Sequence, residues 1–117
     1  MVRNTLMPTK KQLNALPALY ATETAPEKVA VVRYFFGGAG AFYACEFTVD
    51  AIGSASQTGG GVFFGWLVSD FYGQSEYCYM SLYDLKVRLA ERDLHFSPKP
   101  LGDACKQNSD PLPFDLA

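Results

Sequence analysis

Val29-Ala-Val-Val-Arg-Tyr-Phe-Phe36 leads into Gly37-Gly38-Ala39-Gly40 and then into a second apolar run, Ala41-Phe-Tyr-Ala-Cys-Glu-Phe-Thr-Val49. Both runs are rich in β-branched and aromatic residues, which favour β-strands, and the glycines between them favour a tight reversal of the chain. The sequence therefore predicts a β-hairpin here. Strict alternation along the second strand would place Glu46 on the face of Phe42, partly buried, and Phe47 on the opposite face.

Two further strands are expected at residues 62–68 and 77–80, where β-branched and aromatic residues gather again. Apart from residues 50–61, the connections are short enough for antiparallel neighbours. These segments predict an α+β fold in which a small antiparallel β-sheet is packed by one or two helices.

The main helix is expected at residues 81–90, and it begins with a capping-box pattern of Ser81 and Asp84. An apolar stripe with helical spacing would face the sheet: Leu82, Leu85 and Leu89. A shorter helix is expected at residues 9–16, with Thr9 as its N-cap.

The composition favours a single packed domain. The chain has 117 residues, of which 49% are hydrophobic, and this excludes a disordered protein. We expect the domain to span residues 1–101 and residues 102–117, which have two prolines and little periodicity, to form a loosely attached tail. The formal net charge is −2 and no basic cluster occurs, so free nucleic acid is not expected as a ligand.

The three cysteines, Cys45, Cys78 and Cys105, lack the close pairs that structural zinc sites use. Buried thiols in a reducing compartment are expected instead. The first residues lack the apolar core of a signal peptide, and no apolar run is long enough to cross a bilayer. These features indicate a cytoplasmic protein without membrane contact.

A polar segment, Glu91-Arg-Asp-Leu-His-Phe-Ser-Pro-Lys-Pro-Leu101, holds the only histidine. An extended backbone would put Glu91, Asp93 and His95 on one face and Arg92 on the other. His95 is then either a general acid or base oriented by Glu91 or Asp93, or a hydrogen-bonded anchor of the fold. We expect Arg92 to pair with a neighbouring acid, because an arginine on an apolar face is costly unless its charge is met. These four residues form a polar motif whose first role is expected to be structural.

The sequence predicts no cofactor and no metal. Oxygen and nitrogen ligands are available, but no spacing supports a metal site among them: Glu46, Glu91, Asp93 and His95. The run Gly59-Gly60-Gly61 lacks the Lys-Ser/Thr and the helix start of a phosphate loop. Candidate nucleophiles exist, although the sequence does not place them near the histidine: Cys45, Cys78 and Ser97.

Two further segments are candidates for binding. The aromatic residues of the strands favour core packing over a stacking platform for single-stranded nucleic acid, because only Arg33 supplies a basic residue between them. They are Tyr34, Phe35, Phe36, Phe42, Tyr43, Phe63, Phe64 and Trp66. Residues 50–61 are rich in small and polar residues and form a candidate partner-binding loop. Its candidate contact residues are Asp50, Ser54, Ser56, Gln57 and Thr58.

The chain resembles a bacterial, plasmid and phage family, the domain of unknown function numbered twenty-nine fifty-eight. The motifs span nearly all of residues 16–101, and the Glu-Arg-Asp-Leu-His-Phe order with its Pro-Lys-Pro exit is the most specific. The matching pieces are residues 16–20, 29–36, 42–47, 63–68, 80–85 and 91–101. Residues 50–61 and the segment after Leu101 depart from the pattern. The resemblance implies a setting on mobile genetic elements and transfers no catalytic residue.

Two functions follow as expectations. The first is a small non-enzymatic binding protein of mobile elements that contacts a host protein, such as a component of a CRISPR or restriction complex, and inhibits it. Its mildly acidic charge suits contact with the basic channels of such enzymes. The alternative is a small hydrolase or nuclease that uses His95 with Glu91 or Asp93. The absence of metal spacing and of a recognisable nucleophile favours the binding protein.

Overall fold

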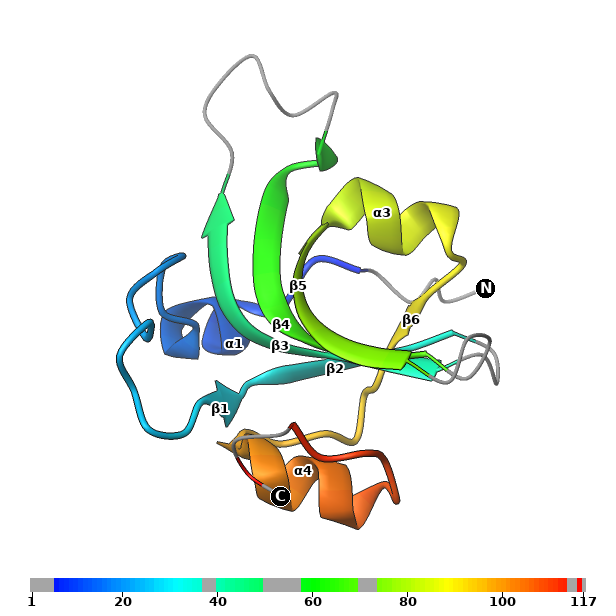
Figure 1. The fold of residues 1–117 in the computed structure, drawn as a ribbon. Helices are drawn as coiled ribbons and strands as arrows, with labels where there is room; N and C mark the ends of the chain where they lie inside the picture. Colours follow the sequence, from blue (N-terminus) through cyan, green and yellow to red (C-terminus); the bar gives the residue numbers. More distant parts are fainter. Residues whose placement is uncertain (1–5, 37–39, 50–57, 70–73, 114–115, 117) are drawn as a thin grey trace.

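A five-stranded antiparallel sheet with the strand order β5-β4-β3-β2-β6 forms the centre of the molecule (Figure 1). The computed structural model describes residues 6–36, 40–49, 58–69, 74–113 and 116. Within them the strands of this sheet are β2 (Val32–Phe35), β3 (Gly40–Val49), β4 (Gly61–Ser69), β5 (Gln74–Ser81) and β6 (Glu91–Arg92). The predicted α+β class and the hairpin of β2 and β3 are confirmed.

The first predicted strand, at residues 29–36, is divided in two. β1 (Val29–Ala30) pairs with β7 (Lys99–Pro100) in a separate two-stranded sheet, whereas β2 stays in the main sheet. Val31 lies between them, and its N–H donates to the carbonyl oxygen of Ala44 at 2.9 Å. Val31 and Val32 are both buried, so the apolar run shows no sign of the boundary between β1 and β2.

A β-bulge in β3 overturns the strict alternation expected for this strand. Cys45 is an extra residue between Ala44 and Glu46, which pair with consecutive residues of β4. The bulge exchanges the faces of all residues that follow it. Phe47 therefore lies in the same core cluster as Phe42, and Glu46 faces the opposite side.

Both predicted helix starts are confirmed. α1 (Lys10–Ala15) has a capping box of Thr9 and Gln12, and α3 (Leu82–Val87) has the expected capping box of Ser81 and Asp84. The predicted end of the second helix is wrong, because α3 stops at Val87. Leu89 has a φ of 57°, outside the helical region, and is 83% exposed, so it does not continue the buried stripe.

The segment after Leu101 is not a loosely attached tail. Residues 101–107 form helix α4 (Leu101–Gln107), and four of them are buried: Leu101, Gly102, Ala104 and Cys105. The start of α4 is tied to the body by Leu101 N–H, which donates to Lys28 O at 2.9 Å. The sequence predicts a tail here because a helix of seven residues is too short to show a clear periodic pattern of apolar residues.

The sheet is curved and has a core on each face, with α3 and α4 on opposite sides (Figure 1). One cluster includes Tyr34, Phe42, Phe63, Leu82 and Leu85, with Leu13 and Leu16 packed against it. The other includes Tyr43, Cys45, Trp66, Leu101 and Cys105. None of the described helices has the length and apolar character that a bilayer-spanning helix requires.

Candidate functional site

The polar segment at residues 91–101 is extended only at its start. β6 pairs with β2, and Asp93 N–H donates to Arg33 O at 2.8 Å, but the chain then turns at Leu94 and His95. The Asp93 side chain accepts the main-chain N–H of His95 at 3.0 Å and stabilises this turn. The expected alternation is therefore wrong beyond Asp93, and Leu94 and His95 are both exposed.

Asp93 belongs to a chain of polar contacts that links β2, β3 and the segment after α4. Arg33 Nη1 forms an ion pair with Asp93 Oδ2 at 3.1 Å, and Arg33 Nε donates to Tyr43 Oη at 3.3 Å. Tyr43 Oη in turn donates to Asp110 Oδ2. Burial raises the pKa of Tyr43, and the bond to Asp110 raises it further. The phenol is thus a neutral donor that holds the three segments together.

Asp93 and His95 line one open cavity of about 500 Å³, together with Arg33, Phe35 and Asp110. Glu91 is exposed on β6 and does not line this cavity. Among the described residues, no hydrogen bond joins the imidazole to either carboxylate, because the contact between Asp93 and His95 runs through the main chain. The structure thus brings together two members of the predicted acid–base set in space, without the orientation that general catalysis uses.

The candidate nucleophiles lie elsewhere. Cys45 is buried beside α4, and Cys78 lines a different cavity. Burial raises the pKa of Cys45 to about 12 and that of Cys78 to about 11, so both thiols are protonated near neutral pH. Ser97 is exposed and follows the turn at His95.

Arg92 is buried, and its Nη1 donates to the main-chain oxygen of Met7. Asp93, one of the acids expected to meet its charge, is paired with Arg33 instead. Arg92 therefore anchors the segment before α1 to β6, which agrees with a structural role for this part of the polar motif.

Glu46 is almost completely buried, with 2% of its surface exposed. Its Oε1 accepts the N–H of Tyr20 at 2.8 Å, and its Oε2 accepts the N–H of Thr22 at 3.1 Å and the hydroxyl of Thr22. Lys28 Nζ donates to Thr22 O at 2.8 Å and reinforces the same loop. The carboxylate holds residues 17–28 on the sheet.

These contacts also separate Glu46 from the other proposed metal ligands. Glu46 lines a cavity with Lys28, whereas Asp93 and His95 line another. Among the described residues, no group of three or more histidine, cysteine, aspartate or glutamate side chains is arranged to hold a metal ion. The structure therefore does not bring Glu46 together with Asp93 and His95.

The aromatic platform and the phosphate loop are not formed. Six of the eight aromatic residues are buried, and only Phe35 and Phe64 are partly exposed. Gly59 and Gly60 have φ values of 76° and 121° and lead directly into β4, so a strand and not a helix follows the glycines. Aromatic side chains pack the core here, as the sequence favoured.

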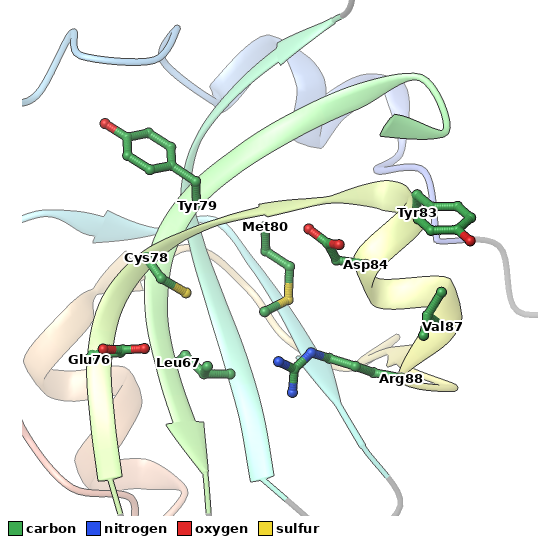
Figure 2. Close-up of a pocket in the computed structure, with 9 residues that line it drawn as sticks. All are labelled: Leu67, Glu76, Cys78, Tyr79, Met80, Tyr83, Asp84, Val87 and Arg88. Atoms are coloured by element: carbon green, nitrogen blue, oxygen red, sulfur yellow. The ribbon is translucent and has the colours of Figure 1, made fainter. Parts of the chain in front are cut away.

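A second open cavity, of about 670 Å³, lies between β5 and α3 (Figure 2). Its inner wall is apolar, with Leu67, Met80 and the Cys78 thiol. Two carboxylates and one guanidinium surround this wall: Glu76, Asp84 and Arg88. Figure 2 shows the Arg88 side chain and the Cys78 sulfur pointing into the space between the strand and the helix.

Exposed tyrosines lie on both sides of strand β5. Tyr20 and Tyr79 are 62% and 51% exposed on the face of the sheet that carries Phe64, and Tyr83 on α3 is 50% exposed, with Val87 exposed on the same helix. The rings of Tyr20 and Tyr79 lie 6.0 Å apart and line a separate cavity with Lys28 and Glu46. Tyr83 lines the cavity between β5 and α3, and Figure 2 shows the Tyr79 ring directed away from it. We call the three exposed tyrosines and Val87 the edge surface. Tyr34 and Tyr43 are fully buried in the same fold, so the exposure of Tyr20, Tyr79 and Tyr83 distinguishes this surface.

The edge surface was missed by reasoning from the sequence. Its residues come from the loop after α1, from β5 and from α3, and only the tertiary structure brings them together. The available signal was the alternation of Tyr77 and Tyr79 in the predicted strand at residues 77–80. The predicted partner loop is not tested, because Asp50, Ser54, Ser56 and Gln57 lie outside the described residues. Thr58 is described, and its hydroxyl accepts the N–H of Gly60 at 3.4 Å.

Comparison of the chain with protein-family models, with curated proteins and with solved structures finds no match. The resemblance to a mobile-element family therefore stays a prediction carried by the sequence motifs.

Proposed function

We propose that this protein is a non-enzymatic binding protein that contacts another protein through the edge surface. The observation that carries the proposal is the exposure of three tyrosines along the β5 edge of the sheet, with Tyr20 and Tyr79 on one side of the strand and Tyr83 on the other. Tyrosine buries a large apolar area on binding, loses little conformational entropy and keeps a polar hydroxyl, and it is enriched among residues that dominate binding energy.

The proposed partner is a cytoplasmic host protein that belongs to a defence complex, such as a CRISPR or restriction enzyme. Support for this class comes from the resemblance to a family of mobile elements and from the net charge of −2. Around the cavity between β5 and α3, Glu76 and Asp84 outnumber Arg88, and this charge suits the basic surfaces of enzymes that process nucleic acid.

The test is affinity capture from a bacterial host lysate with three forms of the protein. The wild type is compared with a double variant, Tyr79→Ser and Tyr83→Ser, and with His95→Ala. We expect one stoichiometric partner to be retained by the wild type and by His95→Ala, and to be lost from the double variant. Titration calorimetry with the purified partner then measures the affinity of each form.

The His95→Ala variant separates the two candidate functions. If no form captures a partner while the wild type hydrolyses a nucleic acid or a small ester and His95→Ala does not, the binding proposal is wrong and the alternative hydrolase is supported. Capture that persists in the double variant would instead place the contact away from the edge surface.

A further inference from the structure

One side of β5 has no strand partner among the described residues. The strand lies at the edge of the main sheet and pairs with β4. Its sequence over residues 74–81, Gln-Ser-Glu-Tyr-Cys-Tyr-Met-Ser, contains one charged residue and neither lysine nor proline. Lysine and proline are residues with which natural sheets protect exposed edges. A strand of eight residues is long enough to pair with another strand.

The alternation of hydrogen bonds identifies the residues of β5 that face the open side. In an antiparallel sheet, successive residues of a strand bond alternately to the neighbours on either side. The N–H of Phe36 donates to Gly40 O at 3.1 Å, and Arg33 O accepts from Asp93 N on the β6 side, so the phase of the β2–β3 pair is known. The strand registers extend this alternation from β3 through β4 to β5. The N–H and C=O groups of Cys78 therefore point toward β4.

Ser75 and Tyr79 have the opposite phase, so their N–H and C=O groups point to the open side. Ser81 shares this phase, and its N–H does donate outside the sheet, to Asp84 Oδ2 at 2.9 Å. For Ser75 and Tyr79, no hydrogen bond from another described residue reaches these groups. The edge therefore offers main-chain donors and acceptors at the spacing of a strand.

The cavity beside this edge indicates the side chains that an added strand would carry. The face of β5 that lines it has Cys78 and Met80 at its centre, and these suit small apolar side chains. Glu76 and Asp84 lie among the same lining residues with Arg88, which leaves one carboxylate in excess. A lysine or arginine on the same face of the added strand would meet that charge.

Building on the proposed function, we propose that β5 accepts an extended segment of the partner protein as an additional strand. The segment pairs with the main chain at Ser75 and Tyr79, and its inward side chains are small apolar residues flanked by basic ones. Tyr83 then lies beside its inward side chains, and Tyr20 and Tyr79 lie on its opposite face. A second copy of this chain fits less well, because it would bring its own Glu76 and Asp84 to the same carboxylates.

The main-chain contact is tested with Ser75→Pro in the complete protein, with Ser75→Ala as the matched control. Proline removes an N–H that does not serve the β4 ladder, and edge strands tolerate proline at such positions. We expect the partner captured by the wild type to bind Ser75→Ala unchanged and Ser75→Pro at least about tenfold more weakly. Normal binding by Ser75→Pro, with loss from the Tyr79→Ser and Tyr83→Ser double variant, overturns strand addition while the proposed function stands. Binding that survives in all variants overturns both.

A peptide titration decides the question even if Ser75→Pro does not fold. The probe is the synthetic peptide acetyl-Lys-Thr-Val-Thr-Val-Thr-Lys-amide, whose alternate residues present Lys, Val, Val and Lys on one face. Nuclear magnetic resonance of labelled wild-type protein should show the largest shifts at the amides of Ser75 and Tyr79. Glutamate in place of both lysines, and N-methylation of one alternating set of amides, should each abolish these shifts. Shifts elsewhere, no shifts, or unchanged binding of both N-methylated sets overturn the proposal.

The oligomeric state of the free protein is the last arm of the test. Sedimentation at increasing concentration should give a monomer. A dimer that Ser75→Pro dissociates would show that a second copy occupies the edge, and the proposal of a basic partner segment would then be wrong.

Discussion

At the scale of single residues, Glu46 links the sheet to the loop that carries Tyr20. Replacing it with glutamine keeps the volume but puts an NH₂ group among three donors, so at least one of them loses its acceptor. We expect Glu46→Gln to lower the free energy of unfolding by about 1 to 3 kcal/mol, the usual cost of an unsatisfied buried group. Urea denaturation measures this, with the exposed Glu23→Gln as control. Equal midpoints for the two variants would show that the hydrogen bonds of Glu46 do not stabilise the fold.

Arg92 is the second residue whose role is structural. Arg92→Ala removes the donor to Met7 O and the packing of the aliphatic stem in a site that is 9% exposed. We expect a loss of about 1 to 3 kcal/mol in the free energy of unfolding. Thermal melts compare it with Lys86→Ala, an exposed substitution on α3. An unchanged midpoint for Arg92→Ala would show that the segment before α1 is held by other contacts.

At the scale of elements, α4 is a required part of the fold. Leu101 is fully buried against Trp66 and Cys105 in the second core cluster, whereas Leu94, a few residues earlier, is 65% exposed. We expect Leu101→Ala to cost about 2 to 5 kcal/mol. Leu94→Ala should have an effect within about 0.5 kcal/mol. Chemical denaturation of both variants checks the contrast, and similar midpoints would mean that α4 is dispensable.

The elements that the sequence predicted well are those with local signals. Ser81 with Asp84, and the dense run of β-branched residues at residues 29–36, act on their own backbone within a few residues. The bulge at Cys45 and the division at Val31 have no such signal, because each depends on the strand that lies beside it. α4 was missed because three of its four buried residues are small and its partner surface is a face of the sheet that is distant in sequence.

At the scale of the whole molecule, the contrast between local signals and contacts of distant segments also explains which parts of the candidate site were predicted. His95 and Asp93 are close in sequence, and the structure keeps them on one cavity. The edge surface is built from three segments, so no window of the sequence contains it. The register of β5 against β4 decides which of its main-chain groups stay open, and register follows from the packing of both faces.

We expect the free energy of unfolding to decrease at alkaline pH because of the buried thiols. Burial raises the pKa of Cys45 and of Cys105 to about 12, from 9.0 in the unfolded chain. The folded form thus keeps protons that the unfolded form loses, and the free energy of unfolding falls as pH rises from about 9 to about 12. Below pH 9 these groups add no pH dependence. Urea midpoints from pH 7 to pH 10.5 test this, and a serine at either position should flatten the slope. A flat profile for the wild type would contradict it.

The bulge in β3 has a consequence for changes in chain length. The extra residue shifts the alternation of side chains by one position between the two halves of β3. Deleting Cys45 would therefore leave Phe42 and Phe47 on their present face, at the cost of a small void beside α4. Deleting Tyr43 would also restore regular alternation between Phe42 and Phe47, but it would exchange the faces of Ala44 and Cys45 and remove the hydroxyl that contacts Arg33 and Asp110. A deletion scan across residues 41–47, scored by soluble expression and by melting, should find that Cys45 is the best tolerated position. A lower melting temperature for the Cys45 deletion than for the Tyr43 deletion would contradict this.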